Sequence, residues 1–142
     1  MGNIDTLVRE NIKKLIPYSS ARSEYKGENG IFLDANENPW GSYNRYPDPF
    51  QLKLKEKIAK VKGINPDQLF LGNGSDGIVD MTYRIFCEPT VDKALTFPPT
   101  FGMYTVAAGI NNVALIKEPL DDDFLIKRAT LLPHLTDPSI KL

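Results

Sequence analysis

The sequence has 142 residues, of which 42% are hydrophobic and 25% charged, and its formal net charge is −1; this describes one globular domain and argues against a nucleic-acid-binding surface or a polybasic membrane patch. No apolar run approaches the ~18 residues of a membrane span, and no basic region followed by an apolar core marks a secretion signal. The only cysteine, Cys87, cannot form an internal disulfide and fits a reducing, cytoplasmic setting as a buried structural thiol, while the only histidine, His134, argues against a His-based metal cluster, so we expect no metal site.

The first thirty residues predict a helix followed by a loop. Apolar residues recur at helical spacing over residues 4–16, and Pro17 ends that helix. The polar, glycine-bearing stretch 18–30 predicts a loop, and the apolar residues 31–33 predict a short strand.

The next segment predicts an irregular connection and then a helix. Residues 34–39 are dense in side chains that hydrogen-bond their own backbone. Residues 40–49 contain two prolines and three aromatic residues, so we expect an extended segment that contacts another surface. An amphipathic helix is predicted over residues 50–61, ending near Gly63, with a turn at residues 65–67.

A glycine-rich turn follows and has the pattern of an anion-binding site. The apolar run 69–71 meets the Gly-Asn-Gly turn 72–74, and a helix is predicted to start at Ser75 or Asp76. Both side chains can accept hydrogen bonds from the first-turn N–H groups of a helix. Several N–H donors and the positive end of the helix dipole then point at one place, which suits a phosphate group. The alternative is an ordinary capped helix after a turn.

The rest of the chain alternates helices and strands. Residues expected on the buried side of the first of these helices, which Pro89 closes, are Ile78, Val79, Met81, Ile85 and Phe86. Further helices are predicted over residues 101–108, ended by Gly109, and over 125–135, interrupted by Pro133; strands are predicted over 94–97, 113–116 and 139–142. This alternation predicts βαβ units and a mostly parallel sheet, which is an α/β architecture. Because the core is thin and no helix follows the last strand, we expect that the sequence is truncated.

Five ordered motifs carry a specific resemblance to a known family. They read LDANENP (33–39), NRYPD (44–48), GNGSD (72–76), RIFCEP (84–89) and PTFGMY (99–104). With the leader from Arg9 to Arg22, they closely resemble the N-terminal part of the histidinol-phosphate aminotransferases, pyridoxal 5'-phosphate (PLP) enzymes of fold type I. The resemblance covers nearly all of the chain. It implies an N-terminal arm and extended segment over residues 1–49 and the incomplete first part of the PLP-binding large domain over residues 50–142.

The family implies a cofactor role for five positions. Backbone N–H groups at Gly74, Ser75 and Asp76 would hold the cofactor phosphate. Phe101 would stack on the pyridine ring where the family usually has Tyr, which keeps the aromatic face and loses a hydroxyl. Tyr46 would reach across a homodimer interface to the phosphate of the partner's cofactor. The alternatives are a core residue for Phe101 and surface packing for Tyr46.

Two further positions have an implied substrate role. Tyr18 would lie near the substrate phosphate, and Asn36 near the amino-acid end of the substrate. The alternatives are a helix-end contact for Tyr18 and a bridge between backbone groups for Asn36. The sequence departs from the family at Gly77, where Glu is typical, and at Thr90, where Gly is usual after Glu-Pro.

The intact enzyme implied by the resemblance moves an amino group from L-histidinol phosphate to 2-oxoglutarate in histidine biosynthesis. Transamination by PLP needs a Schiff-base lysine, an acid on the pyridinium nitrogen and an arginine for the substrate carboxylate. In the family these residues follow the region matched here, so we expect no catalytic residue in this chain and no activity from it alone. The alternatives are an aromatic aminotransferase, a threonine-phosphate decarboxylase, or a non-catalytic dimerisation fragment.

Overall fold

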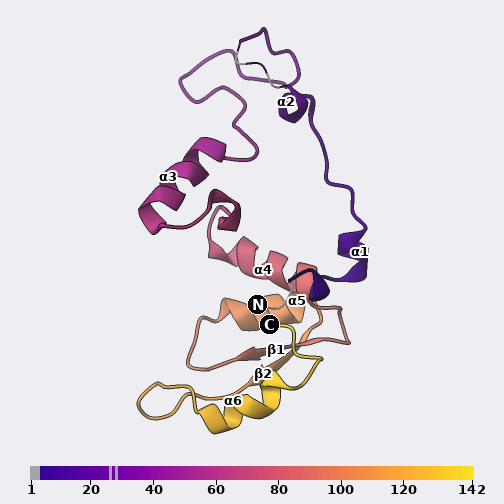
Figure 1. Cartoon of the computed structure of the whole chain (residues 1–142), viewed down its shortest axis with the longest axis vertical. Coiled ribbons are helices and arrows are strands. Elements are labelled where there is room, and N and C mark those ends of the chain that lie inside the picture. Colours follow the sequence, from indigo (N-terminus) through magenta and orange to yellow (C-terminus); the bar gives the residue numbers. More distant parts are fainter. Residues whose placement is uncertain (1–3, 26, 28) are drawn as a thin grey trace. The chain divides into compact units, whose positions relative to one another are not determined.

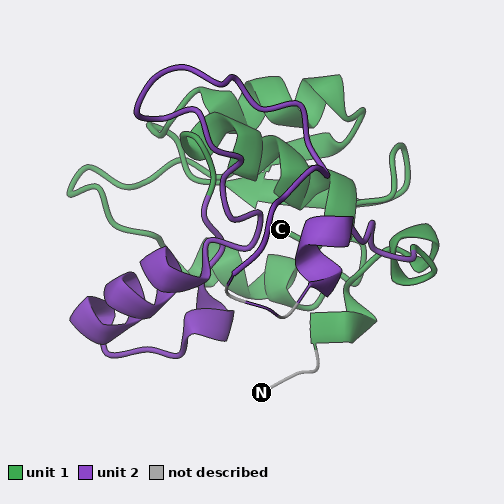
Figure 2. Cartoon of the chain, turned by 90° about the horizontal axis from the view of Figure 1, so that it is seen from above, with its two compact units in different colours: residues 1–15, 72–142 green, residues 16–71 purple. Residues whose placement is uncertain are grey.

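A computed structural model describes residues 4–25, 27 and 29–142, which divide into two compact units. Unit 1 contains residues 1–15 and 72–142, and unit 2 contains residues 16–71 (Figure 2). The boundary expected between residues 49 and 50 falls inside unit 2, and as a domain boundary of a longer protein it stays a prediction. Among the described residues, no helix has both the length and the apolar character needed to cross a membrane.

Two parallel strands form the centre of unit 1. Strand β1 (Lys93–Thr96) pairs with β2 (Ala114–Lys117), with Lys93 opposite Ala114 (Figure 1). Both predicted strands are confirmed within one residue at each end. The parallel pairing also confirms the α/β class, since parallel neighbours need a crossover connection, here provided by a helix.

The last residues of the chain lie along the other edge of β1. Lys93 forms a parallel bridge with Ile140, and the N–H of Leu95 donates to the carbonyl of Leu142 at 2.8 Å. The strand predicted over residues 139–142 is therefore present as a short parallel pairing. It makes β1 the central strand of this unit, with backbone partners on both sides.

Helices α4 (Ser75–Phe86) and α5 (Met103–Ile110) pack against each other beside the strands. The Tyr83 hydroxyl joins them by donating to the carbonyl of Tyr104 at 3.2 Å. Figure 1 shows α5 and α6 on opposite sides of the strand pair. The buried core consists of Tyr83, Cys87, Ala94, Ala107, Ala108 and Val113.

One predicted core residue of α4 is wrong, and the helical period explains why. Met81 is 42% exposed, whereas Tyr83, absent from the predicted buried side, is only 4% exposed. Val79, Tyr83 and Cys87 follow at intervals of four and so share one face, while Met81 lies about 200° around the helix from both Val79 and Tyr83. The buried thiol predicted at Cys87 is confirmed, and burial raises its pKa to about 11.

The end of α5 differs from the prediction. Gly109 lies inside the helix and does not end it. The chain turns two residues after Ile110, where Asn112 takes a φ of 53°. Asn tolerates this left-handed conformation better than most residues do, so an Asn rather than the Gly provides the stop.

Helix α6 covers Arg128–Leu135, which is three residues shorter than predicted at its start. The Asp121 carboxylate accepts hydrogen bonds from the N–H groups of Asp123 and Leu125 at 3.0 and 2.8 Å. These bonds fold the preceding residues into a turn, because an Asp side chain competes with helical backbone bonds. The interruption predicted at Pro133 is wrong, since the helix continues through this residue to Leu135.

The single helix predicted for the N-terminus is wrong. The structure has a 3-10 helix at Ile4–Thr6 and a short α1 at Glu10–Lys13, separated at Arg9, where ψ is 141°. The N–H of Arg9 donates to the carbonyl of Ile85 at 3.0 Å, and its guanidinium pairs with Glu88 at 2.8 Å. These contacts with the end of α4 override the local helical pattern.

Helix α3 (Leu52–Lys62) is the longest element of unit 2 and confirms the prediction within two residues. Gly63 ends it with a φ of 68°, as expected for a glycine after a helix. At its start, the Asp48 carboxylate accepts hydrogen bonds from the N–H groups of Phe50 and Leu52 at 2.9 and 2.8 Å. These bonds lower the pKa of Asp48.

The predicted loop over residues 18–30 contains a short helix, α2 (Ala21–Glu24). It begins with a capping box in which the Ser20 hydroxyl accepts from the N–H of Ser23 and the Ser23 hydroxyl accepts from the N–H of Ser20. The Ser-x-x-Ser spacing is a weak form of the usual capping pattern, which has Glu or Gln at the fourth position. Lys26 and Glu28 of the predicted loop lie outside the described residues.

The strand predicted over residues 31–33 is also wrong. Ile31 and Leu33 are 92% and 90% exposed, so neither side chain has a sheet face to cover. Phe32 packs against Arg22, whose guanidinium carbon lies 4.3 Å from the centre of the Phe32 ring. The turn predicted near residue 66 is a 3-10 helix at Pro66–Gln68.

Candidate functional site

The turn before α4 has the conformation that its glycines require. Gly74 has φ 89° and ψ 162°, a region that is essentially restricted to glycine. A Cβ at Gly74 would meet no atom within 4 Å, whereas one at Gly72 would lie 2.8 Å from a side-chain carbon of Ile78. Backbone conformation therefore selects the glycine at 74, and packing selects the one at 72. The helix starts at Ser75, as predicted.

The predicted capping by Ser75 and Asp76 is wrong. No side chain makes a cap hydrogen bond at the N-cap residue Gly74, and the Ser75 hydroxyl instead donates to the Asp76 carboxylate at 3.4 Å. Gly74, Ser75 and Asp76 are all exposed to solvent. The start of α4 is therefore an exposed helix N-terminus without a side-chain cap, and the chemistry of such a terminus fits an anionic group such as a phosphate.

Phe101 lies in the same unit and is half exposed, at 51%. Its ring meets that of Tyr104 edge to face, with centroids 5.9 Å apart. The alternative of a core residue is therefore wrong, because about half of the residue is open to solvent. Thr100 and Tyr104 line a neighbouring apolar cavity of about 360 Å³, whose other lining residues are Val79, Thr82, Tyr83, Leu95, Thr96, Phe97 and Leu142.

The other three predicted residues come together in unit 2. Tyr18, Asn36 and Tyr46 line one hollow of about 450 Å³. Tyr18 and Tyr46 are both exposed. Residues 18, 36 and 46 are far apart in the sequence but line the same hollow, so we treat them as one candidate region. Polar and charged side chains from Ser20, Arg22 and Asp34 complete its lining, with Ala21 and Ala35.

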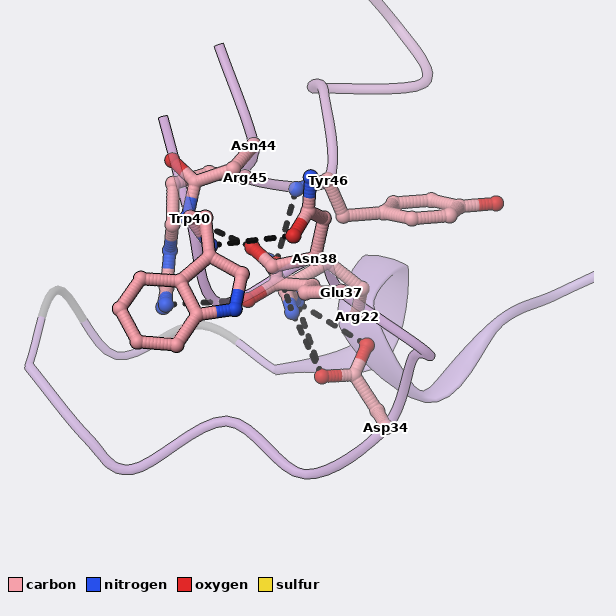
Figure 3. Close-up of polar contacts among 8 residues, drawn as sticks. All are labelled: Arg22, Asp34, Glu37, Asn38, Trp40, Asn44, Arg45 and Tyr46. Carbon is pink, nitrogen blue, oxygen red and sulfur yellow. Dashed lines mark hydrogen bonds and ion pairs between the residues drawn. The ribbon is translucent and has the colours of Figure 1, made fainter. Parts of the chain in front are cut away.

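Sequence reasoning missed a network of charged residues beside this hollow (Figure 3). The Arg22 guanidinium donates to the Asp34 carboxylate from Nε at 3.0 Å and from Nη2 at 2.6 Å. This pair raises the pKa of Arg22 and lowers that of Asp34. Glu37 pairs with Arg45 at 3.0 Å. The available signal was that the motif at 33–39 carries two acidic residues and the motif at 44–48 a basic one, Arg45.

Among the residues that the structure describes, no group of three or more His, Cys, Asp or Glu side chains could hold a metal ion. The Nε2 atom of His134 lies 2.9 Å from a carboxylate oxygen of Glu118. The polar groups of the two candidate regions are instead backbone amides, hydroxyls and ion pairs.

The parallel strands, their crossover helix and the glycine turn define an α/β protein with an exposed helix N-terminus that no side chain caps. A sequence model of the aminotransferase class I and II family matches residues 23–141. The chain therefore belongs to the aminotransferase class I and II family.

Curated relatives narrow the comparison. A histidinol-phosphate aminotransferase from Parabacteroides distasonis is 53% identical over 125 residues, which cover 87% of this chain and 36% of the relative. One from Bacteroides thetaiotaomicron is 49% identical over 144 residues, covering all of this chain and 41% of the relative. The chain thus spans about two fifths or less of the length of these relatives.

A solved structure shares the fold. The crystal structure of a candidate aminotransferase from Burkholderia pseudomallei matches 69% of this chain and 34% of that chain with a TM-score of 0.52. Its sequence identity is 23%, so the match speaks for the fold alone.

Proposed function

We propose that this chain is the N-terminal part of a PLP-dependent histidinol-phosphate aminotransferase. That enzyme moves an amino group from L-histidinol phosphate to 2-oxoglutarate, giving imidazole acetol phosphate and glutamate in histidine biosynthesis. The observation that carries the proposal is the identity of about half of all matched positions to relatives bearing that name. Those names favour it over an aromatic aminotransferase or a threonine-phosphate decarboxylase.

The start of α4 is the proposed site for the cofactor phosphate. Its uncapped N–H groups at Gly74, Ser75 and Asp76 would donate to the phosphate oxygens, and the helix dipole would add to this attraction. The exposed ring of Phe101 would stack on the pyridine ring and fix its plane. When bound, PLP supplies the electron sink that labilises bonds at the carbon bearing the amino group.

The hollow of unit 2 is the proposed region for groups that act across an interface or on the substrate. Tyr46 would donate its phenolic O–H to the cofactor phosphate of a partner chain, so the intact enzyme would be a homodimer. Tyr18 would donate to the substrate phosphate, and Asn36 would contact the amino-acid end of the substrate. We further propose a cytoplasmic location. The cytoplasm is reducing, which suits an unpaired cysteine, and it is also where we place the proposed step of amino-acid biosynthesis.

This chain alone is expected to be inactive. The sequence has no Ser-Lys pair of the kind expected for the Schiff-base lysine. Incubating the 142-residue chain with PLP, histidinol phosphate and 2-oxoglutarate should therefore give no glutamate. Glutamate formation above a no-protein control would contradict this.

A hybrid enzyme tests the proposal itself. Residues 1–142 are joined to the part of the Parabacteroides distasonis relative that lies beyond its matched region, with the unaltered relative as the reference. We expect the hybrid to bind PLP and to convert histidinol phosphate. A folded hybrid that does not bind PLP would support a non-catalytic dimerisation fragment and overturn the proposal.

Tyr18→Phe in the hybrid tests the role of this chain in substrate choice. Loss of one hydrogen bond to a charged phosphate should raise KM for histidinol phosphate by about 10- to 100-fold. The KM for 2-oxoglutarate, which has no phosphate, should change little. Equal changes for both substrates would remove Tyr18 from the phosphate site.

A further inference from the structure

We propose that Glu37 is a positioning residue for Tyr46. Its carboxylate holds the backbone of Tyr46 and so presents the phenol in one direction. The inference rests on the proposed function in one respect: the ligand of the Tyr46 phenol is taken to be the phosphate of the cofactor. The contacts themselves are features of unit 2.

Glu37 contacts the Tyr46 segment at two points. Its Oε1 accepts a hydrogen bond from the N–H of Tyr46 at 2.8 Å, and its Oε2 accepts from Arg45 Nη1 at 3.0 Å. The Glu37 side chain is only 12% exposed, although its segment is irregular. In Figure 3 the Tyr46 ring points away from this network while its backbone faces Glu37. Glu37 therefore fixes the backbone and leaves the phenol free to bind.

Arg22 supports Glu37 from the other side. Its guanidinium is held by Asp34 and stacks on Phe32, and its Nη2 lies 3.8 Å from Glu37 Oε1. Two guanidinium groups thus face two carboxylates, and the cluster has no net charge. Both cations attract the Glu37 carboxylate and so favour this orientation of its side chain.

Additional bonds close the loop between Glu37 and Tyr46. The side chain of Asn44 donates to the carbonyl of Asn38 at 2.8 Å, and the N–H of Trp40 donates to the Asn38 side chain at 3.0 Å. The loop is therefore ordered internally as well as at its ends. Such preorganisation avoids the entropy cost of ordering Tyr46 when the ligand binds.

Two substitutions of Glu37 distinguish a positioning role from a direct effect of its charge on the bound phosphate. A carboxylate near a phosphate-binding phenol repels the phosphate, so its removal alone would tighten binding. Glu37→Gln keeps an oxygen acceptor at the same reach and loses the charge. Glu37→Asp keeps the charge, but its side chain is one carbon shorter and cannot keep the 2.8 Å bond without backbone movement. The two variants therefore separate reach from charge.

The first measurement uses the 142-residue chain and does not depend on function. We expect amide hydrogen exchange at Tyr46 to be at least about tenfold faster in Glu37→Asp than in Glu37→Gln, because loss of the bond exposes this amide. The matched control is Glu56→Asp on α3, an exposed residue whose replacement should leave the exchange of Tyr46 unchanged. Equal exchange in all three variants would overturn the inference.

The second measurement is the dissociation constant of PLP in the hybrid enzyme. Glu37→Asp should weaken PLP binding by about tenfold, and Glu37→Gln should stay within about threefold of the unaltered hybrid. In a Tyr46→Phe background, Glu37→Asp should have no further effect, since a residue that acts through Tyr46 cannot act without its hydroxyl.

The outcomes separate the cofactor role of Tyr46 from the positioning role of Glu37. If Tyr46→Phe leaves PLP affinity unchanged, the Tyr46 assignment in the proposed function fails. If Tyr46→Phe weakens binding but Glu37→Asp does not, the positioning role of Glu37 is wrong. Additive losses in the double variant would also refute it, because they would assign Glu37 an effect independent of Tyr46.

Discussion

Replacement of Gly74 by Ala tests the turn on which the proposed phosphate site depends. The backbone there, at φ 89° and ψ 162°, costs a residue with a Cβ about 1–3 kcal/mol. Against this, Gly→Ala restricts the unfolded chain and contributes about 0.4–1 kcal/mol. No atom lies within 4 Å of the added Cβ, so no steric term enters. We expect a net loss of about 1–2 kcal/mol.

Two other glycines provide matched controls. Gly77 lies in the first turn of α4, and its added Cβ would also meet no atom within 4 Å; Gly77→Ala should stabilise the helix by up to about 1 kcal/mol. Gly102 is the N-cap of α5 with φ −61°, which Ala adopts freely. Gly102→Ala should therefore be neutral or slightly stabilising.

The assay is urea unfolding of the 142-residue chain followed by far-ultraviolet circular dichroism. The expected separation between Gly74→Ala and Gly77→Ala is about 1–3 kcal/mol, or roughly 2–12 °C in Tm. Equal stability of the three variants would refute the left-handed turn at Gly74. It would also remove the structural reason for placing the phosphate there.

Four further predictions concern stability and reactivity. Thr90, at φ 65°, occupies a left-handed position, so Thr90→Gly should stabilise the chain by about 1 kcal/mol in urea unfolding. Asp48→Ala should destabilise it by about 1 kcal/mol by removing the two hydrogen bonds that its carboxylate accepts at the start of α3. Because the folded pKa of Asp48 is lowered from 3.8, this loss of stability should be complete above about pH 4 and should disappear as the pH falls through the lower folded pKa. Tyr83→Phe should cost about 0.5–1.5 kcal/mol, since the carbonyl of Tyr104 loses its donor, and a Tm equal to that of the unaltered chain would contradict the bond. Cys87, with its pKa raised to about 11, should react with iodoacetamide at pH 8 only at the rate of unfolding, which a titration of labelling against urea would show.

The regular part of unit 1 could be predicted because local pattern and tertiary structure agree there. Strands β1 and β2 each contain a short apolar run, at residues 94–95 and 114–116, and each run lies beside a helix of clear period. The start of α4 at Ser75 follows from the glycines before it. In these places each local preference favours the same fold, which is the condition for a reliable prediction.

The failures occur where distant contacts or missing neighbours decide the structure. Arg9 leaves the helical region because its N–H and guanidinium bind the end of α4, which is more than seventy residues away. Residues 31–33 have strand-forming side chains, but no strand pairs with them among the described residues. Neither fact can be read from an eleven-residue window of sequence.

In the candidate site, too, some features could be predicted from the sequence and others depend on distant contacts. The motifs identified Tyr18, Asn36 and Tyr46, and the structure places all three on one hollow. They did not identify Glu37 as the acceptor for the Tyr46 amide, because that pairing depends on how the intervening loop closes. A charged residue within a motif suggests a contact, but its partner comes only from three-dimensional structure.

The absence of a cap at α4 links stability to function. A Ser, Thr, Asp or Asn at the N-cap would stabilise the helix by about 1 kcal/mol over Ala, but by only a few tenths of a kcal/mol over the Gly that is present. The chain carries Ser75 and Asp76 one and two residues too late to do this, and places Gly74 at the N-cap in a conformation open only to glycine. A side-chain cap would occupy the N–H groups that an anion would bind. This helix end therefore forgoes the small gain of a side-chain cap and keeps its N–H groups open to an anion, which fits the proposed phosphate site.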